Sequence, residues 1–223
     1  MDSYERGRFR RTVSGITGLA HLMGVTAIIL VLVWLLHYRE GIEYDSGNPS
    51  HVFNVHPFLM VFGLVFFAGE AAMAYKTVLA ERKVQKFAHM VLQLIATVLG
   101  IVAICAVFKY HNMLNLAHMT SLHSWIGMGT ICLFIMQWLF GFSVFWLPNA
   151  PNATRERELP WHICAGRALL YMAIVSALTG LMQKELLQGL GWSRELRLVN
   201  FTGIAILLFG IAVDFSIGLT RYV

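Results

Sequence analysis

Six apolar stretches, each long enough to cross a lipid bilayer, constrain the fold of this chain more than any other feature. A membrane-spanning helix needs about 20 mostly apolar residues. Charged residues make up only 13% of the sequence, whereas a soluble domain carries roughly a quarter. We therefore expect an all-α membrane protein with six transmembrane helices, at residues 13–36, 55–75, 87–108, 121–146, 161–183 and 198–219.

The connections between these stretches are short and polar, and the sequence contains no internal repeat or low-complexity tract. We expect one domain over residues 1–223, with residues 1–12 as an N-terminal cytosolic segment. The first stretch is too long for a cleaved signal peptide, and no small-residue cleavage site follows it. The three cysteines, which we expect to be small buried side chains without metal spacing, are Cys105, Cys132 and Cys164.

Lysine and arginine are distributed unevenly between the two sides of the predicted helices. Eleven fall on the side of the two termini and five on the other; the eleven are Arg6, Arg8, Arg10, Arg11, Lys76, Arg82, Lys83, Lys86, Arg155, Arg157 and Arg221. The richer side faces the cytosol in most membrane proteins, so both termini are expected there. The net charge of +5 is the difference between 17 basic and 12 acidic residues. No pattern for nucleic acid accompanies it, so we interpret the charge through the loop asymmetry. The sequon at Asn152 should then remain without sugar.

Four histidines lie near the beginnings of spans two to five: His56, His89, His123 and His162. An ionisable residue in a membrane segment is costly and indicates a functional site. The topology places His56 and His123 at one depth, near the non-cytoplasmic face, and His89 and His162 near the cytoplasmic face. Imidazole pairs that face each other across a helix bundle suit haem iron. Two bis-histidine haems would leave no open iron position, which favours electron transfer.

Two polar residues repeat the spacing of these ligands. Glu70 follows His56 by fourteen residues, and Gln137 follows His123 by the same interval. Fourteen residues are about four helical turns, so each polar residue returns to the face of its histidine, roughly 20 Å deeper. Both are haem-pocket candidates that could hydrogen-bond a propionate or a neighbouring side chain; simple polar contacts between helices are the alternative.

Several motifs occur in order along almost the whole chain: LLHYREG (35–41), FNVHPFLMVFGL (53–64), GEAAMAYK (69–76), AVFKYHN (106–112), SLHSWIG (121–127), QWLFGFSVFWLP (137–148) and PWH (160–162). Through them the chain resembles cytochrome b561 proteins, the eukaryotic ascorbate-dependent transmembrane oxidoreductases. The resemblance implies six helices whose central four, spans two to five, hold two b-type haems. It pairs His56 with His123 and His89 with His162, and it implies a homodimer.

The resemblance also implies a substrate at each face. Cytosolic ascorbate is the expected electron donor, with Arg82, Lys86 and Arg155 at its site, where basic side chains suit a monoanion. Lys76 is a further haem-pocket candidate. The expected acceptor on the far side is monodehydroascorbate or a ferric chelate, which would make the protein a ferrireductase.

The acceptor site is expected near His111 and His118, and His51 is a further candidate for a cluster able to hold a metal chelate. A tyrosine often precedes SLHSW in such proteins, and this chain has Thr120 instead, so acceptor binding departs from the family pattern.

Two other functions remain compatible with the residues alone. One is a cytochrome b membrane anchor for a larger quinone-linked redox complex, and the other is a haem-free, histidine-lined metal or proton transporter. The sequence contains no address motif, so an endomembrane (vacuolar, lysosomal or vesicular) and the plasma membrane are both open.

Overall fold

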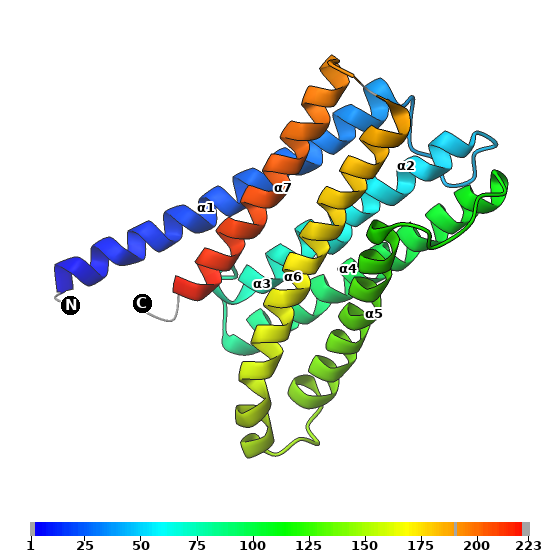
Figure 1. Cartoon of the computed structure of the whole chain (residues 1–223). Helices are drawn as coiled ribbons and strands as arrows, with labels where there is room; N and C mark the ends of the chain where they lie inside the picture. Colours follow the sequence, from blue (N-terminus) through cyan, green and yellow to red (C-terminus); the bar gives the residue numbers. More distant parts are fainter. Residues whose placement is uncertain (1–2, 190, 220–223) are drawn as a thin grey trace.

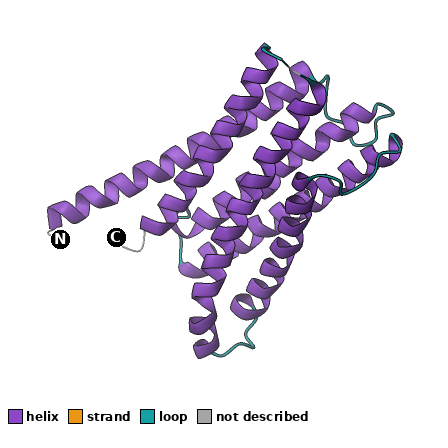
Figure 2. Ribbon diagram, viewed as in Figure 1, coloured by secondary structure: helices purple, strands orange, loops and turns teal. Residues whose placement is uncertain are grey.

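The computed structural model describes residues 3–189 and 191–219, and the side chains of 11–187, 189 and 191–219. This part of the chain consists of helices joined by loops and contains no strand (Figure 2). Arg221 lies outside it, as do the side chains of Arg6, Arg8 and Arg10. The elements are α1 (Ser3–Val33), η1 (Trp34–Tyr38), α2 (Pro49–Leu59), η2 (Met60–Phe67), α3 (Ala68–Thr77), α4 (Arg82–Met113), α5 (Leu122–Gly141), η3 (Phe142–Trp146), α6 (Asn152–Gln188) and α7 (Arg194–Leu219).

Six of these helical segments are long and apolar enough to cross a membrane, as predicted. They comprise Arg11–Tyr38, Pro49–Thr77, Arg82–Met113, Leu122–Trp146, Asn152–Leu187 and Arg194–Leu219. The fifth begins nine residues earlier than expected, because α6 continues through Pro160 instead of starting after it. The 37 residues of α6 span about 55 Å, more than the roughly 30 Å of a bilayer core, so this helix must project beyond the lipid.

Three spans contain π-helical segments, in which the backbone hydrogen bonds run to the fifth residue. The longest, η2, occupies the middle of the second span between α2 and α3. Because i→i+5 hydrogen bonds widen a helix, each residue in η2 turns through a smaller angle than in an α-helix. Side chains before and after η2 therefore do not share the faces that α-helical spacing predicts.

The second to fifth spans form the central bundle. The second span packs along α4, α4 contacts α5, α5 packs on α6, and α6 contacts η2 to complete the ring. The two outer helices, α1 and α7, pack against each other beside this bundle (Figure 1). Lys76, near the end of α3, contacts Val13 of α1 and Ser216 of α7. Hence α1 begins, and α3 and α7 end, at the same end of the protein.

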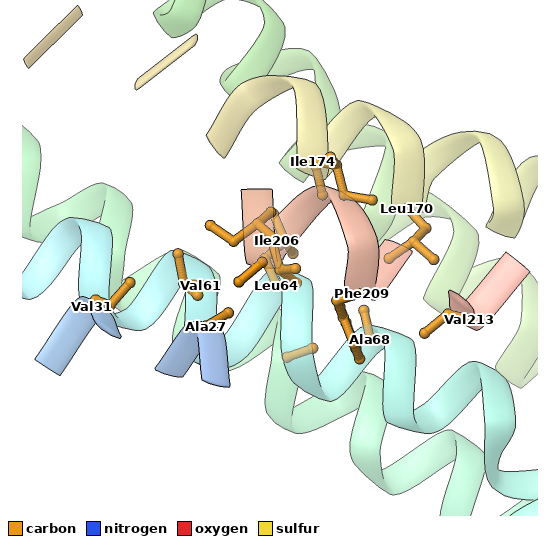
Figure 3. Packing of buried hydrophobic residues seen from close by; sticks show 14 of the residues in the cluster. Ala27, Val31, Val61, Leu64, Ala68, Leu170, Ile174, Ile206, Phe209 and Val213 are labelled. Carbon is orange, nitrogen blue, oxygen red and sulfur yellow. The ribbon is translucent and has the colours of Figure 1, made fainter. Parts of the chain in front are cut away.

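The main apolar core lies beside the central bundle, where α1 and α7 meet the second span and α6 (Figure 3). Phe209 of α7 is only 1% exposed, and its ring fills the space that side chains at Gly24 and Gly69 would occupy. In the same cluster Phe209 lies beside Ala68, and Leu64 lies beside Ile206.

Many large apolar side chains face outward along the helices, as lipid contact requires. Cys105, Cys132 and Cys164 are also exposed, so the prediction that they are buried is wrong. Hydrophobicity alone does not separate an interior position from a lipid-facing one, because both environments are apolar.

Candidate functional site

The predicted histidine partners face each other inside the central bundle. His56 on α2 and His123 on α5 have ring centroids 6.0 Å apart. His89 on α4 and His162 on α6 form the second pair, with centroids 6.2 Å apart. We call the end of the bundle with the first pair the His56 end and the other the His89 end. The helices therefore bring together the same two pairs that the predicted depths indicated.

Both separations fit two imidazoles on opposite sides of one metal. Nitrogens that each bind the same ion at about 2 Å lie about 4 Å apart, and the ring centres lie farther apart by one ring radius on each side. Imidazole is a usual axial ligand of haem iron. The donor type and the spacing therefore suit bis-histidine haem ligation at both ends.

Backbone carbonyls orient three of the four rings. Nδ1 of His56, His89 and His123 lies 3.1, 2.8 and 2.8 Å from the carbonyl oxygens of Ala103, Ala71 and Ser176, respectively. A carbonyl only accepts a hydrogen bond, so each Nδ1 must carry the proton. Nε2 of each ring then keeps its lone pair, which is the form that binds a metal.

A side chain holds the fourth ring. The Gln137 amide nitrogen donates to the backbone carbonyl of His162 at 2.8 Å and lies 3.0 Å from His162 Nδ1. Gln137 thus meets the ligand pair at the His89 end, at the depth that its spacing from His123 predicts.

Two glycines make room for the ligands. A Cβ at Gly180 would lie 2.7 Å from Cε1 of His123, and a Cβ at Gly141 would lie 2.9 Å from Cε1 of His162. Real Cβ atoms essentially never approach other heavy atoms so closely. Any side chain at either position would therefore displace one of these histidine rings.

Two helices link the pairs. On α4, His89 is fourteen residues before Ala103, whose carbonyl orients His56. On α6, His162 is fourteen residues before Ser176, whose carbonyl orients His123. At 1.5 Å per residue, the two pairs are separated by about 20 Å along the bundle. That separation covers much of the hydrocarbon thickness of a bilayer.

Glu70 and Lys76 face away from the ligand pairs, in contrast to their expected place in a haem pocket. Glu70 Oε1 lies 2.9 Å from Nδ1 of His21 on α1. The physical reason is η2, which lies between His56 and Glu70 and rotates the rest of the span. The Lys76 ammonium donates to the Val13 carbonyl at 2.8 Å and to the Thr17 hydroxyl. Both residues connect α3 to the outer helices.

The three basic residues predicted for an anion gather at the His89 end. Arg82 and Arg155 both lie near enough to Lys86 to act on it electrostatically. The Arg155 side chain donates from Nη2 to the Leu147 carbonyl at 2.9 Å, while its buried Nε has no hydrogen-bond partner among the described residues. A buried donor without a partner beside two cations is a favourable place for an anionic ligand.

Tyr75 is part of this site, although sequence reasoning did not select it. Its ring lies 5.4 Å from the His89 ring, and the Arg82 guanidinium lies 4.2 Å above it. The side chain therefore connects the basic cluster to a ligand histidine. The sequence feature that could have indicated Tyr75 is its position in the motif GEAAMAYK, at the end of the second span.

The predicted histidines of the His56 end also come together. The rings of His111 and His118 stack with centroids 5.3 Å apart, and Phe108 stacks on His118 at 4.6 Å. His51, in the first turn of α2, instead lies near Ser46 and Glu43 of the preceding loop. In the described part of the chain no three histidine, cysteine or acidic residues form a metal-binding group. His111 and His118 thus form a pair.

Comparison with known proteins adds independent findings. A model of the family described as eukaryotic cytochrome b561 matches residues 55–188. The chain is 41% identical over 202 residues to a probable ascorbate-specific transmembrane electron transporter 1 of Oryza sativa subsp. japonica, covering 88% of this chain and 86% of the relative. It is 39% identical over 205 residues to transmembrane ascorbate ferrireductase 1 of Arabidopsis thaliana (90% and 86%). A plasma membrane ascorbate-dependent reductase of Xenopus laevis is 38% identical over 197 residues (85% and 69%).

Proposed function

The chain belongs to the eukaryotic cytochrome b561 family, and on this basis we propose that it carries electrons from ascorbate across a membrane. It is an integral, multi-pass membrane protein and acts as an ascorbate-dependent oxidoreductase. Family membership argues against the two alternatives left open by the residues, the quinone-linked anchor and the haem-free transporter. The observation that carries the proposal is the pair of facing imidazoles at each end of the bundle.

Each imidazole pair would hold one haem b, giving two per chain. His56 with His123 and His89 with His162 would supply the axial ligands, and Gly180 and Gly141 would keep the rings in position. Haem b, when bound, supplies reversible one-electron chemistry at its iron. The protein's contribution is to fix two such centres about 20 Å apart along the bundle and to keep water away from them.

Ascorbate would bind at the His89 end. Lys86 and Arg155 attract the monoanion, and the unpartnered Arg155 Nε can donate to one of its oxygens. Arg82 and Tyr75 lie between the solvent and His89 and complete the docking surface. Ascorbate that gives up one electron and one proton leaves as monodehydroascorbate. Because one electron and one proton leave together, the product keeps a single negative charge, and the basic side chains attract it as they attract ascorbate.

At the His56 end, the stacked His111 and His118 would receive the acceptor, monodehydroascorbate or a ferric chelate. The concentration of basic loop residues at the His89 end supports a cytosolic location for that end and for both termini. The host membrane, an endomembrane or the plasma membrane, and assembly as a homodimer stay predictions.

The visible spectrum of the purified protein tests this function. We expect two haems per chain and rapid reduction of both by ascorbate. A colourless protein would contradict the proposal, and haem that ascorbate does not reduce would favour the quinone-linked anchor.

A matched pair of variants tests the donor site. Lys86→Gln removes a charge three residues before His89 and should raise the KM for ascorbate roughly tenfold, the effect of losing one unit charge about 10 Å from the anion at an effective dielectric constant of about 20. Lys83→Gln removes the same charge from an exposed position three residues earlier and should leave KM nearly unchanged. Equal effects of the two substitutions would show that only the general positive charge of this end matters.

A further inference from the structure

Lys184 on α6 is a cation that the electron-transfer scheme does not yet use. It follows Gly180 by four residues, and residues four apart share one face of a helix. Gly180 borders the His123 ring. Lys184 therefore extends along the same face, one turn nearer to the His56 end of the bundle.

The contacts of Lys184 place its charge near the ligand pair. The ammonium nitrogen lies 3.8 Å from the centre of the Phe53 ring, and that ring centre is 6.3 Å from the centre of the His56 ring. The ammonium is thus at most about 10 Å from the His56 ring. Phe53 provides an aromatic face for the cation, but it carries no negative charge.

No described side chain forms a hydrogen bond or ion pair with the Lys184 ammonium. The carboxylate of Glu195 is near enough to act on it electrostatically, but Glu195 already binds two other groups. Its Oε1 accepts a hydrogen bond from Trp34 Nε1 at 2.8 Å and forms an ion pair with Arg39. A partly buried cation without its own anion is costly near a membrane interior.

We propose that Lys184 binds a propionate carboxylate of the haem held by His56 and His123. This inference rests on the proposed two-haem function. Haem is the only resident group of that function that brings carboxylates into this region. The ammonium would offset the negative charge of the propionate, and the haem would then accept an electron more readily. Lys184 is accordingly a positioning residue that raises the reduction potential at the His56 end.

The size of the effect follows from the distance. Two unit charges roughly 10 Å apart, at an effective dielectric constant of about 20, change an equilibrium constant roughly tenfold. For a one-electron couple, a tenfold change corresponds to about 59 mV. Removing the ammonium should lower the potential of one haem by about that amount and leave the other unchanged.

The test is an optical redox titration of the purified holoprotein with chemical mediators, which requires no ascorbate. Lys184→Met removes the charge and keeps much of the chain length, Lys184→Arg keeps the charge, and Lys184→Gln is a second neutral variant if the methionine variant is not obtained. Lys109→Met is the matched control, because Lys109 is at the same end but pairs with Asp45 at 2.9 Å. We expect a lower midpoint for one haem in the neutral variants only.

Unchanged midpoints in Lys184→Met or Lys184→Gln would overturn the proposal, as would an equal shift in Lys184→Arg. A raised KM for the acceptor with unchanged midpoints would mean that Lys184 docks the acceptor, which also contradicts it. Wild-type protein with fewer than two haems would contradict the two-haem function and this inference together. Two haems with unaltered potentials would contradict the role of Lys184 alone.

Discussion

A Gly180→Ala substitution tests the ligand geometry with a single methyl group. The added Cβ would lie 2.7 Å from Cε1 and 3.0 Å from Nδ1 of His123, whereas ordinary contacts begin at 3.4 Å. The ring must therefore retreat by roughly 0.7 Å, while metal–ligand distances are kept to within about 0.2 Å. We expect this variant to lose the haem between His56 and His123 and to retain the other.

The same substitution should not destabilise the helix. Alanine is favoured over glycine in a helix interior by about 1 kcal/mol, so α6 itself gains stability. Gly166→Ala is the matched control on the same helix, because its Cβ would meet nothing closer than Gln137 Nε2 at 3.8 Å. Gly141→Ala should remove the opposite haem, since its Cβ would lie 2.9 Å from Cε1 of His162.

The assay is the ratio of haem to protein in the purified, detergent-solubilised chain, with the visible spectrum and the helix content measured on the same sample. We expect one haem per chain in Gly180→Ala and two in Gly166→Ala, at equal helix content. Two haems with an unshifted spectrum in Gly180→Ala would refute the reasoning, because the His123 ring could then not occupy the ligand position assigned here.

Three further outcomes are expected. His89→Ala should lose the haem at its own end and spare the other, and a spectrum that still shows both would mean that His89 is not a ligand. Gln137→Leu removes the amide that donates to the His162 carbonyl and should weaken haem affinity at that end tenfold to a hundredfold, the usual cost of losing such support. Haem transfer to a competing apoprotein measures this affinity, and an affinity equal to that of the wild-type protein would contradict the prediction. Asn152 should carry no sugar when the protein is made in eukaryotic cells, and a glycan found by mass spectrometry would reverse the topology.

The identical spacing of Gln137 and Glu70 from their histidines shows where sequence reasoning holds. Between His123 and Gln137 the helix is regular, and Gln137 reaches His162 as the α-helical period predicts. Between His56 and Glu70 the π-helical η2 intervenes, and Glu70 binds His21 on α1. An apolar run such as MVFGLVFF shows no periodicity from which a change of helix type can be read.

The positions of the spans and the facing of the histidine pairs could be predicted because length, hydropathy and loop charge act over whole segments. Local departures from regular helix geometry could not be predicted in this way. Pro160 is typical of a helix boundary, yet α6 passes through it, since membrane-spanning helices tolerate proline where neighbouring groups satisfy the freed backbone carbonyl. The proximity of Lys184 to the His56 pair could not be predicted either, because it depends on a contact with Phe53, which is distant in the sequence and near only in the fold.

The fourteen-residue interval on α4 and on α6 has a consequence for how this protein can vary. Each helix carries one histidine of a facing pair and a carbonyl that orients a histidine of the other pair, so each helix fixes the distance between the two pairs. Inserting one residue within either interval would turn one site by about 100° relative to the other and add about 1.5 Å. We therefore expect changes in chain length only in the loops and at the helix ends. A designed protein with a longer bundle would need seven added residues, which are close to two full turns, in every helix of the bundle.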